Sequence, residues 1–238
     1  MGGPQCLEGK CRRDNLDLLK LITIGMHNRS IKYWLDFGGL LGVVREGDMI
    51  VGDDDMDICA TMEEFDKAMA YFDEINNDPE GLYFVQRNSK YYRLCGALIL
   101  YQVRPRSPDN AALLDLFFFE DDGIGGLRSM WTHEDDTTMD TIFPVHLYFV
   151  ESWGFSVNIP SKPTDRLIQK YGENYMTPVS YKSTLIGKFR RGRNVFGRCM
   201  KIEYRNRYNM YRLALLIFLT LGVFSVVLRF EHQQLTYR

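Results

Sequence analysis

The chain has 238 residues, 45% hydrophobic and 25% charged, and its formal net charge is −2. This length allows one substantial core, so one compact domain is expected. Five scattered cysteines without a CxxC pair indicate neither a zinc ribbon nor a disulfide framework, and we expect reduced thiols. No charged stretch followed by an apolar run opens the chain, which argues against a cleavable signal peptide.

Charge is distributed unevenly along the chain. Residues 182–238 hold twelve Lys and Arg against two Glu, a balance of +10, and residues 1–181 hold seventeen basic against twenty-nine acidic residues. The two parts are therefore expected to face different surroundings.

The expected elements alternate between helices and strands. Residues 14–33 have helical spacing of apolar residues, with Asp14 as the expected cap. A short strand in "YWLDFG" is expected to end at Gly38-Gly39, followed by a second strand in "DMDICA" and an amphipathic helix over residues 61–75. Further strands are expected at residues 82–87, 96–103 and 112–120. The pattern indicates an α/β or α+β fold with a mixed sheet flanked by helices.

The C-terminal part is organised differently. Residues 182–212 form a basic segment with ten Lys and Arg, residues 213–228 form an apolar run without charge, and residues 229–238 form a short tail. We expect the apolar run to be a helix that spans a membrane once, with a buried core helix as the alternative. The basic segment beside it suits anionic lipid headgroups better than nucleic acid, so no nucleic-acid partner is expected.

Carboxylates gather in the stretch "VGDDDMDICA". If it contains a strand, Asp55 and Asp57 lie on the same face, and Met56 and Ile58 face the core. Asp115 interrupts the apolar strand "LLDLFFF", where a lone buried carboxylate would be costly. A divalent metal shared by Asp55, Asp57 and Asp115 explains all three, and oxygen ligands suit Mg²⁺ or Mn²⁺.

Two other interpretations of the acidic stretch stay open. It could be a solvated acidic turn. It could also be a calcium loop, because Asp53, Asp55, Asp57 and Glu64 fall at positions 1, 3, 5 and 12 of the EF-hand pattern. The residue at position 6 of that pattern is Ile58, and this position favours glycine.

Gly38 and Gly39 precede the acidic stretch and would let backbone N–H groups approach phosphate oxygens closely. No Walker Lys-Ser/Thr follows them, so this is not a P-loop. A glycine pair, two aspartates on one face and a third aspartate on a later strand are together typical of nucleotidyltransferase-fold enzymes.

A closer resemblance rests on three segments in order. "YWLDFGGLLGVVREGDMIVGDDDMDICA", "LLDLFFFEDDG" and "NIPSKPTDRLIQKYGENYMTP" resemble the motifs of the LicD/fukutin family. The resemblance implies a catalytic domain over residues 31–181, preceded by a lead and helix over residues 1–30. It also implies a metal triad of Asp55, Asp57 and Asp115, a phosphate-binding turn at Gly38 and Gly39, and a phosphate or substrate contact at Arg45.

The family resemblance further implies an activity. It implies transfer of a phospho-alcohol, such as phosphocholine or an alditol phosphate, from a CDP-linked donor to a hydroxyl of a glycan acceptor. Gly39 and Gly52 depart from residues common in the family, which leaves the donor open. A glycosyltransferase using a nucleotide-sugar and a catalytically silent, membrane-attached binding protein are the alternatives.

The expected location is a membrane of the endomembrane system. The basic residues before the apolar run would place the catalytic domain in the cytosol by the positive-inside rule. The family resemblance instead implies the lumen. Asn28, in the sequon "NRS", would report which side is correct.

Overall fold

The computed structural model describes residues 8–92, 96–131 and 136–178. Their helices and strands belong almost entirely to one compact unit, residues 1–91 and 97–185, and a second unit of residues 92–96 and 186–238 lies almost wholly outside the described residues. The apolar run 213–228 and the basic segment 182–212 also lie outside them. Among the described residues, no helix combines the length and apolar character needed to cross a bilayer.

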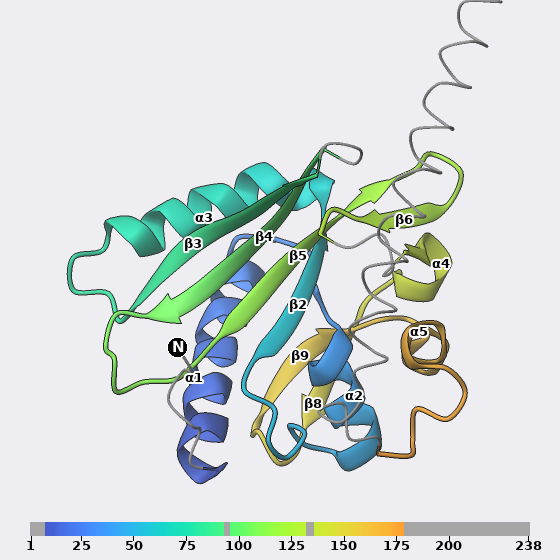
Figure 1. Ribbon diagram of the computed structural model, residues 1–238, viewed down its shortest axis with the longest axis horizontal. Coiled ribbons are helices and arrows are strands. Elements are labelled where there is room, and N and C mark those ends of the chain that lie inside the picture. The colour runs from blue at the N-terminus through green and yellow to red at the C-terminus, as the bar shows by residue number, and fades with distance from the viewer. Residues whose placement is uncertain (1–7, 93–95, 132–135, 179–238) are drawn as a thin grey trace, which may run out of the picture. The chain divides into compact units, whose positions relative to one another are not determined.

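A seven-stranded mixed sheet forms the centre of the fold (Figure 1). Five strands follow one another in the order β1-β2-β5-β4-β3, β6 pairs with β5, and β7 pairs with β6. These strands are β1 (Trp34–Leu35), β2 (Met56–Thr61), β3 (Tyr83–Tyr92), β4 (Gly96–Pro105), β5 (Leu114–Asp121), β6 (Gly126–Ser129) and β7 (Thr137–Thr138). A separate hairpin joins β8 (His146–Val150) to β9 (Phe155–Ile159). The α/β class with a mixed sheet is therefore confirmed.

Helices α1 (Glu8–Asn28) and α3 (Phe65–Asn77) cover one face of this sheet (Figure 1). The remaining helices are η1 (Met62–Glu64), a 3-10 turn before α3, then α2 (Phe37–Glu46), α4 (Met139–Ile142) and α5 (Pro163–Tyr171). The main core contains Leu19 and Ile22 of α1 together with Ile58 of β2 and Phe118 of β5. The first helix thus packs into the same core as the sheet.

Alternate side chains of β2 and β5 point to opposite faces of the sheet, and each face packs into a different core. Ile58 and Phe118 face the main core, whereas Cys59 and Phe117 face a second, smaller core with Trp34. Asp57 is two residues from Cys59, and Asp115 is two residues from Phe117. Both aspartates therefore lie on the sheet face turned away from α1 and α3. The fold therefore carries its carboxylates on the face that these two helices leave uncovered.

Three local expectations are corrected by the structure. The first helix begins at Glu8 and runs through Asp14, whose carboxylate accepts a hydrogen bond from the Ala111 amide at 3.5 Å instead of capping the helix. The strand in "YWLDFG" ends at Leu35, and Gly38-Gly39 lies in the first turn of α2. Cys11 forms a disulfide, so reduced thiols are wrong at that residue, while Cys59 is free and buried.

Candidate metal centre

Two neighbouring parallel strands bring the predicted triad together. β2 pairs with β5 in a register that places Asp57 directly opposite Asp115, and Asp55 immediately precedes β2. One carboxylate oxygen from each of Asp55, Asp57 and Asp115 lies within 4.8 Å of the other two. Oxygens this close fit the first shell of a divalent cation. Met56 and Ile58 are buried on the opposite face, as the alternation predicted.

The electrostatics of the triad show the cost of leaving these carboxylates ionised together. Burial, and then the charge of Asp55, raises the pKa of Asp57 well above its ordinary range. Burial also raises the pKa of Asp115 to about 6, against the hydrogen bond from Gln102, which lowers it. Burial and then the charge of Asp54 raise the pKa of Asp55. A cation between the carboxylates would remove this repulsion, so the donor set fits a divalent metal.

Asp53 adds a fourth carboxylate beside the triad. Burial, followed by the charges of Asp55 and Asp54, raises its pKa to about 6. A Cβ built on Gly38 would lie 2.5 Å from Oδ2 of Asp53 and 3.9 Å from Oδ2 of Asp57. The first turn of α2 therefore approaches the carboxylates so closely that a side chain at residue 38 would require Asp53 to move.

A buried ion pair holds the start of α2 in this position. Asp36 caps the helix by accepting from the Phe37 amide at 2.8 Å, and it also accepts from the Trp34 indole at 3.0 Å. Nε of Arg166, on α5, donates to both oxygens of Asp36 at 2.9 and 3.0 Å. Both side chains of this pair are only 1% exposed. Phe37 adopts a φ of 47°, which is rare for a residue with a Cβ.

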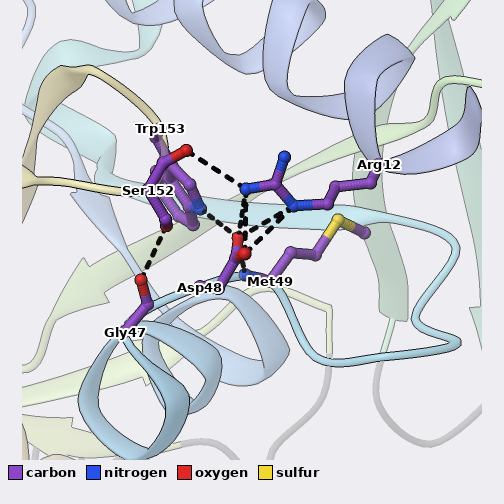
Figure 2. A network of polar contacts seen from close by, with 6 residues as sticks. All are labelled: Arg12, Gly47, Asp48, Met49, Ser152 and Trp153. Atoms are coloured by element: carbon purple, nitrogen blue, oxygen red, sulfur yellow. Dashed lines mark hydrogen bonds and ion pairs between the residues drawn. The ribbon is translucent and has the colours of Figure 1, made fainter. Parts of the chain in front are cut away.

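A polar network fixes the other end of the loop that leads to the aspartates (Figure 2). Arg12 of α1 donates to Asp48 with Nε at 3.0 Å and Nη2 at 2.7 Å, and the Trp153 indole donates to Asp48 at 2.9 Å. Ser152 donates to the Gly47 carbonyl at 2.7 Å. The loop between α2 and β2 is thus tied to α1 and to the β8–β9 turn.

Arg45 occupies a different position from the other predicted site residues. It lies in the last turn of α2, whereas Gly38 lies in the first, a separation of roughly 10 Å along the helix axis. Its guanidinium donates to Glu46 at 2.6 and 3.1 Å. The structure thus brings Asp55, Asp57, Asp115 and Gly38 together and places Arg45 in an ion pair. Gly39 packs against Leu35, where an added Cβ would lie 2.8 Å from Leu35 Cδ1.

Sequence reasoning missed Gln102, which the structure places beside the triad. Gln102 of β4 lies opposite Asp115 in the register and donates Nε2 to Asp115 Oδ1 at 2.7 Å. Its Oε1 accepts from Asn88 and, at 3.0 Å, from Nη2 of Arg104. Two donors on Oε1 fix the orientation of this amide, so its NH₂ group points to Asp115. The alternating polar residues in "YQVRP" were the available signal.

The calcium-loop alternative is wrong. Asp57 lies within strand β2, and Glu64 ends a short 3-10 turn and pairs with Lys67 at 2.7 Å. A calcium loop would instead need these residues to coil around one ion between two helices.

Comparison with known proteins agrees with this arrangement. The family model described as LicD/FKTN/FKRP, nucleotidyltransferase domain, matches residues 30–162. The chain belongs to this family. Membership indicates an enzyme of the nucleotidyltransferase or phosphotransferase type with a glycan-modifying role. No curated protein matched the chain.

Solved structures similar to this LicD-family chain include two of one protein. The crystal structure of ANT(2″)-Ia in complex with adenylyl-2″-tobramycin is 15% identical, with a TM-score of 0.40, covering 81% of this chain and 98% of that one. The solution structure of the antibiotic-resistance factor ANT(2″)-Ia is 15% identical, with a TM-score of 0.41, covering 84% and 96%. These scores are too low to carry an argument about substrates.

Proposed function

We propose that this LicD-family protein is a metal-dependent phosphotransferase. It moves a phospho-alcohol, such as phosphocholine or an alditol phosphate, from a CDP-linked donor to a hydroxyl group of a glycan. The observation that carries the proposal is the meeting of Asp55, Asp57 and Asp115, with carboxylate oxygens within 4.8 Å of one another. The family membership supports the reaction type.

The proposed reaction is a substitution at phosphorus. The acceptor hydroxyl loses its proton to solvent and its oxygen forms a bond to the donor phosphorus, the bond from that phosphorus to the CMP oxygen breaks, and CMP leaves with the electron pair. A bound Mg²⁺ or Mn²⁺ would neutralise charge on the phosphate oxygens and on the departing CMP. The three aspartates would hold that cation, and Gln102 keeps Asp115 oriented by occupying its Oδ1.

Helix α2 contributes its glycine-containing first turn to phosphate binding in this proposal. Gly38 carries no Cβ, and the buried Asp36–Arg166 pair sets the direction in which the helix begins. Backbone N–H groups at the start of a helix favour anions when a cation has neutralised nearby carboxylates. Gly38 and Gly39 are therefore assigned to the donor phosphates, and Arg45 is left as a candidate contact of the substrate.

A donor panel tests the proposal. The protein is incubated with Mg²⁺, a glycan mixture and CDP-choline, CDP-ribitol, CDP-glycerol or UDP-sugars, and the released nucleotide is identified. We expect CMP from a CDP-linked donor and far slower release of CMP from the Asp57→Asn variant. Release of UDP from a UDP-sugar would support the glycosyltransferase alternative, and absence of turnover with every donor would support a silent binding protein.

We also propose that the protein is attached to a membrane through residues 213–228. The uncharged run and the ten basic residues before it support this attachment. Alkaline carbonate should leave the protein in the membrane pellet. Release into the supernatant would overturn the attachment.

A lumenal catalytic domain is the proposed orientation. Cys11 is in a disulfide, which is typical of oxidising compartments. Asn28 is exposed at the end of α1, so its sequon is accessible to glycosylation. Endoglycosidase should increase the gel mobility of the wild type and leave Asn28→Gln unchanged. Digestion of the domain by protease added outside intact microsomes would place it in the cytosol instead.

A further inference from the structure

Arg104 lies on the same sheet face as the predicted metal ligands. β4 and β5 are antiparallel, and their register places Gln102 opposite Asp115. Side chains two residues apart in a strand point to the same face, so Arg104 shares the face of Gln102 and Asp115. The guanidinium thus lies on the sheet face that carries the aspartates, away from α1 and α3.

The register also places Arg104 in line with Asp55. One step beyond the pairing of Val103 with Leu114, Arg104 lies beside Leu113. The Leu113 carbonyl accepts from the Met56 amide at 2.9 Å, which places Asp55 on the other side of residue 113. Two strand spacings separate the backbones of Asp55 and Arg104, about 10 Å. The side chains of Asp55 and Arg104 therefore extend from the same sheet face, with the backbone of Leu113 between them.

The guanidinium of Arg104 is only partly satisfied by the protein. Nη2 donates to Gln102 Oε1 at 3.0 Å, and the buried Nε has no hydrogen-bond partner. Within residues 8–92, 96–131 and 136–178, no carboxylate lies at ion-pair distance from Arg104. An arginine used only to neutralise the acidic cluster would pair directly with a carboxylate, but Gln102 stands between Arg104 and Asp115.

We propose that Arg104 binds the pyrophosphate of the nucleoside-diphosphate-linked donor. A guanidinium presents several N–H groups in a planar fork that matches phosphate oxygens, and Nη1 remains for such a ligand. The cation held by the aspartates and the guanidinium of Arg104 would bind the same phosphates from opposite sides. Arg104 is then a donor-binding residue contributed by β4. This assignment rests on the proposed function.

Titration calorimetry on the full-length chain tests the assignment. CDP is titrated at saturating Mg²⁺ into the wild type, Arg104→Gln, Arg104→Lys and Arg87→Gln. Arg87 is exposed on β3 and lies four residues from Tyr83, so it shares the sheet face of this main-core residue. Asn88, which donates to Gln102, lies on the opposite face with the aspartates. Arg87→Gln therefore removes the same charge without touching the site.

Arg104→Gln should weaken CDP binding by about tenfold or more, because a charge-assisted contact to phosphate is lost. Arg104→Lys should recover part of that loss, since the charge remains but the fork does not. Arg87→Gln should match the wild type. In a separate titration with Mn²⁺ alone, Arg104→Gln should bind equally well or more tightly, because a positive charge near a cation has been removed.

The outcomes separate three explanations. If Arg104→Gln weakens Mn²⁺ and CDP binding together, Arg104 only supports Asp115 through Gln102, and the assignment is wrong. If the wild type binds CDP and Arg104→Gln binds it equally well, the assignment is wrong while the proposed function stands. If the wild type binds Mn²⁺ but no CDP, the proposed function itself fails.

Discussion

At the scale of single residues, the candidate site is a set of carboxylates that the fold forces together. Asp57 and Asp115 face each other across two paired strands, and burial, followed by the charge of Asp55, raises the pKa of both. Such an arrangement destabilises the metal-free protein at neutral pH and favours cation binding. Activity and stability should therefore respond in opposite directions when one carboxylate is removed.

Asp57→Asn tests this opposition. The variant should lose turnover by about a hundredfold or more, since a metal ligand is missing, while its metal-free form unfolds at the same or a higher urea concentration. Asp53→Asn should be milder, because Asp53 stands outside the closest triad. Near-normal turnover of Asp57→Asn with Mg²⁺ or Mn²⁺ would show that the metal assignment is wrong.

Asp115→Asn tests the pH dependence. Because burial raises the pKa of Asp115 to about 6 from 3.8, the native state holds a proton that the unfolded chain releases. This contribution to stability is complete below about pH 4 and is lost as the pH rises through about 6. In EDTA, Asp115→Asn should gain free energy of unfolding over the wild type at pH 7.5 and lose that gain near pH 4.

The matched control for this comparison is Glu120→Gln, an exposed residue of the same strand. Its free energy of unfolding should follow that of the wild type at both pH values. An Asp115→Asn gain that did not vary with pH would contradict the titration of this carboxylate.

At the scale of elements, the packing of α2 and α5 depends on one buried ion pair. Arg166 and Asp36 are each 1% exposed and join helices that contact the site. Removing one partner leaves a buried charge without its counter-charge, which is far more costly than losing a surface pair. The contact between α2 and α5 should therefore be sensitive to the loss of either partner.

Arg166→Met should lower the free energy of unfolding by about 3 kcal/mol, measured by urea denaturation. Lys162→Met is the matched control, because Lys162 and Asp140 form an exposed pair at 2.8 Å. That variant should leave the free energy of unfolding close to that of the wild type. Equal losses in the two variants would show that burial of the Asp36–Arg166 pair has no energetic significance.

The elements also show what the sequence could and could not predict. The sequence predicted strands at residues 82–87, 96–103 and 112–120 correctly. This was possible because apolar character and alternation within a segment are enough to indicate a strand. The start of α1 was missed because Asp14 bonds to Ala111 across the fold. The role of Gln102 required the β4–β5 register, which no local pattern reveals. Partners far apart in sequence, such as Asp36 and Arg166, were missed for the same reason.

At the scale of the whole molecule, ligands should stabilise the native state as a unit. The triad exists only when β2 and β5 are paired, so a metal and nucleotide that bind there bind the folded chain alone. Mass action then adds stability, about 2.7 kcal/mol when free ligand reaches one hundred times its Kd.

CDP with Mg²⁺ should accordingly raise the melting temperature, and EDTA should abolish the rise. Calcium without nucleotide should produce less stabilisation than CDP with Mg²⁺, because the triad has no calcium-loop geometry. A shift produced by Ca²⁺ alone and unchanged by CDP would contradict the proposed site. Differential scanning fluorimetry on the full-length protein is sufficient for the measurement.

The Asp36–Arg166 pair also bears on the order in which a growing chain can mature. The ribosome delivers Asp36 long before Arg166, which follows 130 positions later. Until Arg166 emerges, burial of Asp36 would leave its charge without a counter-charge. The first turn of α2 should therefore not adopt its final conformation on the nascent chain before that point. Asp55, Asp57 and Asp115 have all been synthesised once residue 115 is added. The first turn of α2, which contains Gly38 and Gly39, is instead fixed only after α5 has been synthesised. Metal capture during synthesis should therefore precede competence to hold a nucleotide.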